Sequence, residues 1–475
     1  MNREGLTKDS NGGGQVWEKA IRLADALRAA ARSRSALVIA ASVGVGILFK
    51  LAAFVREAYI AAKFGVSGQM DAYFAFQQLP FTLMSFMGGA FCVAFVPAFA
   101  KAKQQREEGK WLAAILNFTA GAAVVATIVC IIGSPVFARL AGQSVNAGAA
   151  NTLVILSLSF VPVVLIGMCA GMCLGMGRNI IAMVVQGLAY LIMAIALIFM
   201  CTIWGADQLS LPVSMTFGFA LVGLASLIFI VTTGNLRFDR ESLLHPLKIR
   251  GMQSFLKQMS ASATESAGYL TNQLLAVWFL SLAATGAVTA NNYAMRIGML
   301  SLSLFSLPLS QLAQARMCLV APENRKRVLV EYLLIALLIL GPVAILQILL
   351  RTELVRLVYM RGKFSAADLA AVCSFVPAWV MYVLVMTANF LLAKYEFATQ
   401  QGGVYARRML WAYGAVTGLR FAVRGWTEPS AILWCGVIAE GVAFLFGLWK
   451  CLASGAHADE AVPVHAPSLT AQAGN

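Results

Sequence analysis

Charged side chains interrupt the first long apolar part of this 475-residue chain. Lys50, Arg56, Glu57 and Asp71 lie within LFKLAAFVREAYIAAKFGVSGQMDAYFAFQQLP, which runs from 48 to 80. A charge inside such a stretch is costly in a bilayer unless it faces protein or a water-filled cavity. In a cavity, Arg would offer a bidentate fork and Lys a point charge to an anionic headgroup such as a diphosphate. These residues therefore predict a binding cavity.

The spacing of the basic residues leaves two interpretations open. On an ideal helix, positions 50 and 57 share a face, and Arg56 is rotated by about 120° from Lys50. Because these charges cannot all pack against one neighbouring helix, a hydrated cavity suits them. In the alternative interpretation, the apolar span ends near Val55, and Arg56 and Glu57 are ordinary interfacial anchors.

Asp71 and Arg296 extend the same question to two other segments. Asp71 follows the turn GVSGQ, where it could either line the cavity or cap the helix that begins there. Arg296 lies a few residues inside a later apolar stretch, and the next basic residue is Arg316. The residues that we expect in one substrate-binding cavity are Lys50, Arg56, Glu57, Asp71 and Arg296.

Further polar residues lie in apolar stretches of the second half, namely Glu265, Asn272, Gln273 and Glu440. Each could couple transport to an ion, pair across helices or hydrogen-bond a neighbour. The three histidines have no metal-ligand cluster beside them, and no P-loop, HExxH or GxSxG motif is present. We therefore expect a transporter without metal or cofactor, rather than an enzyme. Coupling to the membrane potential, Na⁺ or H⁺ stays open.

The composition places these residues in an integral membrane protein. Hydrophobic residues make up 60% of the chain, charged residues only 12%, and the mean hydropathy is +0.77. The net charge of +15 sits in short segments between apolar runs, not in one basic and aromatic patch. Membrane topology explains this distribution better than nucleic-acid binding does.

About twelve apolar stretches are long enough to cross a bilayer. They lie near 36–62, 72–98, 111–133, 149–174, 179–203, 208–234, 259–282, 291–314, 328–350, 367–392, 406–424 and 430–453. The stretch 406–424 is the weakest, because Arg420 and Arg424 interrupt its end. The predicted fold class is an all-α polytopic membrane protein, with about twelve transmembrane helices in two six-helix lobes around a central cavity.

Basic segments orient these spans. The segments 101–110, 235–252, 322–327 and 405–408 fall between alternate spans, so the positive-inside rule places them and both termini in the cytoplasm. The connection 351–368 should be outside, yet it is basic too. We expect it to form an interfacial helix or to contact an anionic headgroup through Arg361 and Lys363.

The predicted domain organisation follows from the spans. A cytoplasmic tail with an amphipathic helix (1–35) precedes an N-lobe (36–234), a basic cytoplasmic linker (235–258), a C-lobe (259–453) and a polar cytoplasmic tail (454–475). The segments GVSGQMDAYFAFQQLP and ATGAVTANNYAMRIGML resemble each other at an offset of about 220 residues. Such an offset is typical of two lobes related by a repeat.

Several segments resemble the MurJ (MviN) lipid II flippases of the MOP superfamily. The resemblance rests on the stretch from 48 to 80, on GGAFCVAFVPAFAKAK, on NNYAMRIGML and on RGKFSAADLAA. It implies a bacterial inner-membrane flippase that alternates access to an undecaprenyl-diphosphate-linked glycan, with membrane lipids around the tail. Independently of the resemblance, we expect no nucleic-acid partner and a functional monomer. It also implies that Lys50 and Arg56 on the first helix, Asp71 on the second and Arg296 on the eighth line or gate the cavity.

The chain departs from this family in its second span. Leu83 and Met84 stand where the family typically has two arginines, and Gly88 stands at an acidic position. The family also tends to have two further helices. An exporter of polyprenyl-linked repeat units for exopolysaccharide, capsule or O-antigen is therefore one alternative. Another is a MATE-like drug or cation antiporter, which would favour an acidic, aromatic cavity. A glycan polymerase would need a large extracytoplasmic loop, and the outside connections here are short.

Overall fold

Helices are the only regular secondary structure in the part of the chain that the computed structural model describes. The described residues are 34–140, 147–203, 205, 207, 209–249, 251–301, 305–399, 401–425 and 428–453. The predicted C-terminal tail, and the predicted N-terminal tail up to residue 33, lie outside these ranges. The side chain of Glu265 also lies outside the described set.

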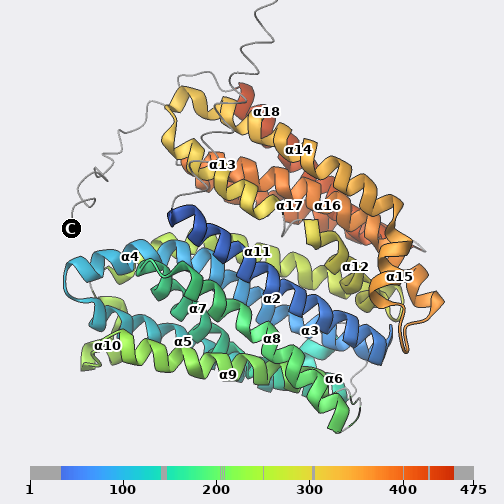
Figure 1. Ribbon diagram of the computed structural model, residues 1–475, viewed down its shortest axis with the longest axis horizontal. Helices are drawn as coiled ribbons and strands as arrows, with labels where there is room; N and C mark the ends of the chain where they lie inside the picture. The colour runs from blue at the N-terminus through green and yellow to red at the C-terminus, as the bar shows by residue number, and fades with distance from the viewer. Residues whose placement is uncertain are drawn as a thin grey trace, which may run out of the picture.

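The helices form two groups (Figure 1). The first group contains α2 (Arg34–Phe64), α3 (Gly68–Phe86), the π-helical turn η1 (Met87–Phe91), α4 (Cys92–Gln104), α5 (Glu108–Leu140), α6 (Ala147–Ser157), α7 (Phe160–Gly175), α8 (Asn179–Ile203) and α9 (Ser210–Thr233). The short elements α10 (Arg240–Leu244) and η2 (Pro246–Lys248) lead out of it.

The second group follows in the chain. It contains α11 (Met252–Ala283), α12 (Ala287–Ser301), α13 (Leu307–Leu319), η4 (Pro322–Asn324), α14 (Arg325–Leu349), α15 (Arg351–Tyr359), α16 (Ala366–Ala398), α17 (Gly402–Val423) and α18 (Ala431–Ala453). α11 and α12 pack against α3 as well as against their own group, so they form the boundary between the two groups (Figure 1).

Among the described residues, seven helical segments are long and apolar enough to cross a membrane: α5, the pair α6 and α7, α8, α9, α14, α16 and α18. The number is eight if the bent pair of α3 and α4 counts as one span. All seven coincide with stretches expected from the sequence. The protein is thus an all-α, multi-pass membrane protein.

The second expected span, 72–98, is not one straight helix. α3 contains Pro80, and the helix then widens into η1 before α4 begins, with a bend of 44° between the two parts. Proline and π-helical turns are the usual causes of such a kink. Gly88 lies in this turn, where an added Cβ would come within 3.1 Å of Gln186 Oε1 on α8.

Glycines on α7 explain how closely α4 packs in the first group. Gly171 and Gly175 lie one turn apart, and an added Cβ would approach the rings of Phe95 and Phe99 to 2.9 Å and 2.6 Å. Those rings stack on each other, with centroids 5.7 Å apart. Small residues let membrane helices approach where the hydrophobic effect gives no driving force.

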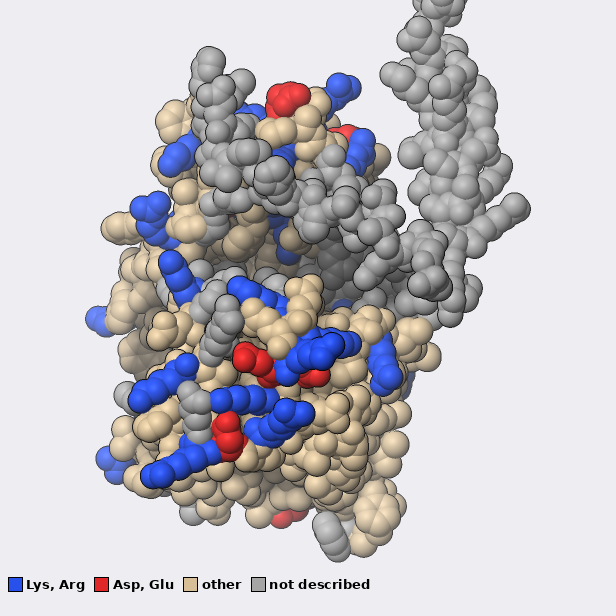
Figure 2. All heavy atoms as spheres, turned by 90° about the vertical axis from the view of Figure 1, so that its left-hand side faces the viewer, with Lys and Arg blue, Asp and Glu red and all other residues tan. Residues whose placement is uncertain are grey.

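One end of the molecule is basic. Lys and Arg side chains gather on the face formed by the α4–α5 connection and α10 (Figures 1 and 2). Asp239 lies there, 3.1 Å from Lys110 Nζ. The backbone N–H of Ser242, and then Lys110, hold the pKa of Asp239 below its ordinary value. We call this end the basic face.

Candidate functional site

A buried carboxylate joins two arginines from different helix groups. Arg56 Nη1 donates to Glu57 Oε1 at 3.1 Å, and Arg296 Nη2 lies 3.3 Å from the same oxygen. Arg56 and Glu57 are on α2, whereas Arg296 reaches them from α12. The arrangement brings together three of the five predicted cavity residues.

The burial of this cluster argues against the interpretation of Arg56 and Glu57 as exposed interfacial anchors. Arg56 and Glu57 are 2% and 3% exposed, and the helix continues for about two turns to Phe64. Arg56 also donates through Nη2 to the hydroxyl of Tyr73 on α3. A charge buried to this degree must be paired and hydrogen-bonded, and the neighbouring groups provide both.

The cluster keeps unused bonding capacity and an excess of positive charge. Two guanidinium groups face one carboxylate, which leaves one net positive charge. Glu57 Oε2 and the Nε atoms of Arg56 and Arg296 have no hydrogen-bond partner among the described residues. Buried polar atoms without partners are rare in native proteins and need an explanation. An incoming anionic headgroup would supply one.

Arg296 is the member of the cluster through which solvent or a ligand has access. The side chain of Arg296 is 28% exposed, and its guanidinium carbon lies 5.6 Å from the centre of the Phe81 ring on α3. Lys50 is exposed, about two turns before Arg56 on α2, and makes no ion pair within the described ranges. The structure therefore separates Lys50 from the buried pair.

Asp71 does not cap its own helix. Ser67 is the N-cap of α3, and its hydroxyl accepts from the backbone N–H of Met70 at 3.4 Å. The carboxylate of Asp71 instead accepts three hydrogen bonds from the start of α12. The donors are the backbone N–H groups of Gly286 (2.7 Å) and Thr289 (2.8 Å) and the Thr289 hydroxyl (2.6 Å). Asp71 thus caps a helix of the other group.

The end of the molecule near Asp71 is closed by further contacts between the groups. Tyr293 on α12 donates its hydroxyl hydrogen to the carbonyl of Gly65, at the end of α2. The backbone N–H of Lys363 donates to the carbonyl of Ala62 at 2.8 Å. Gly362 has φ of +60°, and an added Cβ would lie 2.2 Å from Ala62 O. We call this set of contacts the outer gate.

The connection predicted to contact headgroups lies beside the outer gate. Its first part forms α15, as one of the two expected alternatives requires, and Val355 and Tyr359 are buried. Arg361 and Lys363 are exposed, and Arg361 bonds the carbonyl of Leu357 on its own segment. The backbone of Lys363, rather than its side chain, makes the contact with α2.

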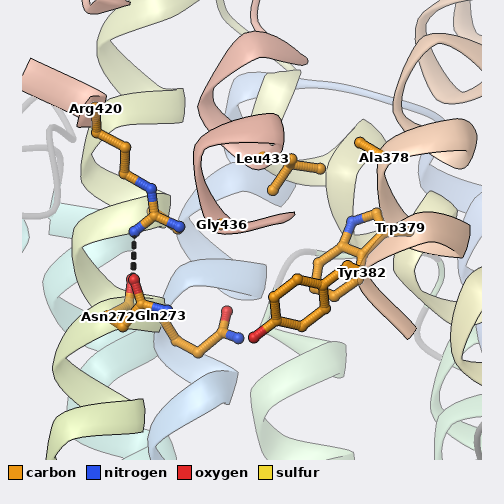
Figure 3. A pocket seen from close by; sticks show the side chains of 9 residues that line it. Asn272, Gln273, Ala378, Trp379, Tyr382, Arg420, Leu433 and Gly436 are labelled. Carbon is orange, nitrogen blue, oxygen red and sulfur yellow. Dashed lines mark hydrogen bonds between the residues drawn. The ribbon is translucent and has the colours of Figure 1, made fainter. Parts of the chain in front are cut away.

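A second polar cluster lies within the second helix group (Figure 3). Arg420, the residue that weakened the eleventh expected span, is 3% exposed. Its Nη1 donates to the side-chain oxygen of Asn272 on α11 at 2.7 Å and to the Asn272 carbonyl at 2.9 Å. Gln273 lines the same pocket. Arg420 is therefore tolerated in α17 because α11 satisfies it.

Glu440 lies beside this cluster, on α18. It is 2% exposed, and Tyr382 on α16 donates to its Oε1 at 2.6 Å. Glu440 also lines a cavity of about 180 Å³ with Tyr269 and Tyr413, together with Thr82 and other residues of α3. This cavity therefore lies between α3 of the first group and α16, α17 and α18 of the second.

Sequence reasoning missed several partners of these residues. Tyr73 and Thr289 were not singled out, although each lies within one of the two segments recognised as a repeat. A buried ion pair between Arg408 Nη2 and Glu396 Oε2, 3.0 Å apart, was also missed. The sequence feature that could have indicated this pair is Glu396, which lies between the apolar stretch 367–392 and the basic segment 405–408.

Comparison with known proteins gives the family. The model of the family described as "Lipid II flippase MurJ" matches residues 60–404, well over half of the chain. A protein from Aquifex aeolicus described as a probable lipid II flippase MurJ is 26% identical over 345 residues. That alignment covers 69% of this chain, and the chain spans 65% of the length of that relative.

Solved structures show the same fold. A lipid II flippase MurJ in an inward closed conformation has a TM-score of 0.76 at 18% identity, covering 87% of this chain and 88% of that one. An inward-facing multidrug resistance MATE transporter of the MOP superfamily has a TM-score of 0.71 at 13% identity, covering 87% and 97%. The fold is therefore shared by both kinds of transporter, and the family model distinguishes them. This chain belongs to the lipid II flippase MurJ family.

Proposed function

We propose that this protein is a flippase that moves a polyprenyl-diphosphate-linked glycan of the lipid II type across the bacterial inner membrane. The observation that carries the proposal is the cluster in which Glu57 is shared by Arg56 and Arg296. It has a net positive charge, unused donors and a position between the two helix groups. A diphosphate headgroup needs such cationic donors.

The proposed topology has twelve spans in two six-helix lobes, 36–234 and 259–453, with the linker 235–258 and both termini in the cytoplasm. Besides the seven segments that are apolar enough by themselves, α2, the bent pair α3 and α4, α11, the pair α12 and α13, and α17 complete the twelve. The clustering of Lys and Arg on the basic face supports a cytoplasmic position for that end (Figure 2).

In this orientation the outer gate faces away from the cytoplasm. Alternating access then requires the contacts of Asp71 with α12 to break, so that α2 and α3 can separate from the second lobe. A headgroup that binds Arg296 competes with Glu57 for that arginine, because both are anions. Loading of the site would thereby loosen one of the links that join the lobes. The polyprenyl tail stays in lipid throughout.

The test is transport of a fluorescent lipid II into the outer leaflet of proteoliposomes. We expect Arg296→Ala to abolish transport, because it removes the accessible guanidinium and leaves Glu57 with one partner. Arg296→Lys should restore only part of the rate, since Lys lacks the fork. Arg316→Ala is the matched control: Arg316 pairs with Glu331 at 2.8 Å on an exposed surface. Wild-type transport by Arg296→Ala would refute the proposal.

A repeat-unit exporter is the second candidate, favoured by the uncharged positions in the second span. Leu83 is partly buried and Met84 is buried, each packed within the apolar core, so neither adds charge to the site. The two candidate functions differ in the lipid that is transported. Mass spectrometry of lipids accumulated in cells depleted of this protein should find lipid II, whereas accumulated polyprenyl-linked repeat units would select the exporter.

A further inference from the structure

A groove runs along the outer surface between α17 and α18. Its volume is about 590 Å³. Trp411 and Phe446 form its rim and are 81% and 56% exposed, whereas Ala443 and Gly447 lie lower, between the helices. Large exposed apolar side chains on a membrane helix face the acyl chains. The groove is therefore open to lipid and apolar along most of its length.

One end of the groove is basic. Arg407, Arg408 and Lys450 line it there, together with a single carboxylate, Glu396. Three positive charges against one negative leave two positive charges. Arg408 is 7% exposed, and its Nε and Nη1 have no hydrogen-bond partner among the described residues, although Nη2 pairs with Glu396. The guanidinium is therefore only partly satisfied by protein.

The basic end of the groove lies at the end of α16 that is opposite the outer gate. α16 begins beside the outer gate, where Asp368 lies close to Gly65, and its 33 residues extend about 50 Å to Ala398. There the Ala398 carbonyl accepts from Arg325 Nη1 at 3.0 Å, next to the basic segment 322–327. α17 starts four residues later. In the topology proposed above, the three basic residues lie at the level of the headgroups.

The length of the groove matches the acyl chains of one leaflet. From Lys450 to Ala439, the last residue of α18 that lines it, the helix rises about 16 Å. One leaflet contributes about half of a 30 Å hydrocarbon core. We propose that the groove binds one anionic phospholipid of the leaflet at the basic face, with its phosphate at Arg407, Arg408 and Lys450 and an acyl chain beside Ala443.

Binding of this lipid is a property separate from glycan transport. The site lies on the lipid-facing side of α17 and α18, whereas the shared Glu57 lies between the helix groups. A polyprenyl chain is far longer than the groove, and a zwitterionic phospholipid would gain little from two net positive charges. The proposal therefore does not depend on the identity of the transported glycan.

The test is native mass spectrometry of the delipidated full-length protein, titrated with phosphatidylglycerol and, separately, with phosphatidylcholine. We expect the wild type to prefer phosphatidylglycerol. The double variant Arg407→Gln/Lys450→Gln leaves the buried Arg408 and Glu396 pair in place, so it should fold. Its affinity for phosphatidylglycerol should fall about thirtyfold, or about fivefold for each charge, with little change for phosphatidylcholine.

Two further variants separate this site from general surface charge. Lys101→Gln/Lys103→Gln removes two exposed charges from the last turn of α4 at the same face, away from the groove, and should bind phosphatidylglycerol as the wild type does. Ala443→Phe fills the groove without changing its charge and should weaken the binding. The proposal is overturned if both double variants lose affinity equally, if Ala443→Phe has no effect, or if undecaprenyl phosphate binds the groove more tightly than phosphatidylglycerol.

Discussion

Replacing Asp71 by Asn tests whether one carboxylate holds the outer gate closed. The native side chain accepts from two backbone N–H groups and one hydroxyl of α12. Asn keeps the shape of Asp but has only one acceptor oxygen, and its NH₂ group would face donors. In Asp71→Asn, either the N–H of Gly286 or the N–H and hydroxyl of Thr289 should therefore lose its acceptor.

The cost can be estimated from these three bonds. A hydrogen bond to a charged acceptor contributes about 1.5–3 kcal/mol, and the charge at the start of α12 adds about 0.3–2 kcal/mol. Part of this sum is offset by the desolvation of a buried carboxylate and by the one acceptor that Asn retains. We expect the closed gate to lose about 2–4 kcal/mol, which is about a 30- to 1,000-fold increase in its opening constant.

Hydrogen exchange measured by mass spectrometry on peptides covering 284–292 reads this opening directly. Exchange in Asp71→Asn should accelerate by the factor above. Asp368→Asn is the matched control, because Asp368 forms a capping box with Ser365 within one helix at the same end. It should leave exchange at 284–292 unchanged. Exchange of Asp71→Asn within threefold of the wild type would refute the view that this carboxylate closes the gate.

Three other substitutions follow from single contacts. Asn272→Leu removes the side-chain acceptor of the buried Arg420 and should lower the free energy of unfolding by about 2–4 kcal/mol, seen as a lower Tm in detergent. Asn272→Asp keeps an acceptor and should retain most of the wild-type stability. An unchanged Tm in Asn272→Leu would contradict the pairing. Gly362→Ala should destabilise the outer gate by about 1–3 kcal/mol, because of its positive φ and the contact with Ala62 O, and speed exchange at 360–365. Gly403→Ala, which meets no atom within 4 Å, is its control, and equal exchange in the two would argue against strain. Tyr382→Phe removes the donor to Glu440 and should cost about 1–3 kcal/mol in unfolding free energy, a prediction that fails if thermal unfolding is unaffected.

Much of the helical framework could be predicted from apolar length alone. The spans at 179–203 and 430–453 agree with α8 and α18 almost to the residue, because a bilayer demands about twenty apolar residues whatever the packing. The bend after α3 could not be predicted in the same way. Gly88 and its neighbours permit a π-helical turn, but contact with α8 is long-range information.

The candidate site likewise has a part that could be predicted from the sequence and a part that could not. Charges in an apolar stretch identified Arg56, Glu57 and Arg296 as members, since a bilayer makes such residues conspicuous. Which atoms pair could not be derived, because α2 and α12 are more than 200 residues apart. Asp71 shows the limit most clearly: its partners are mainly backbone N–H groups, which every residue except proline has, so the sequence carries no mark of them.

Arg420 has a consequence for how the protein is made. Arg420 lies in the last turn of α17, and Arg407 and Arg408 lie near the start of the same helix. The acceptors of Arg420 are on α11, which is synthesised 148 residues earlier, and at Ile432 at the start of α18. α17 is therefore synthesised after one helix that satisfies Arg420 and before the other. A chain truncated after α17 would keep both acceptors of Arg420 on Asn272 and lose the one at Ile432.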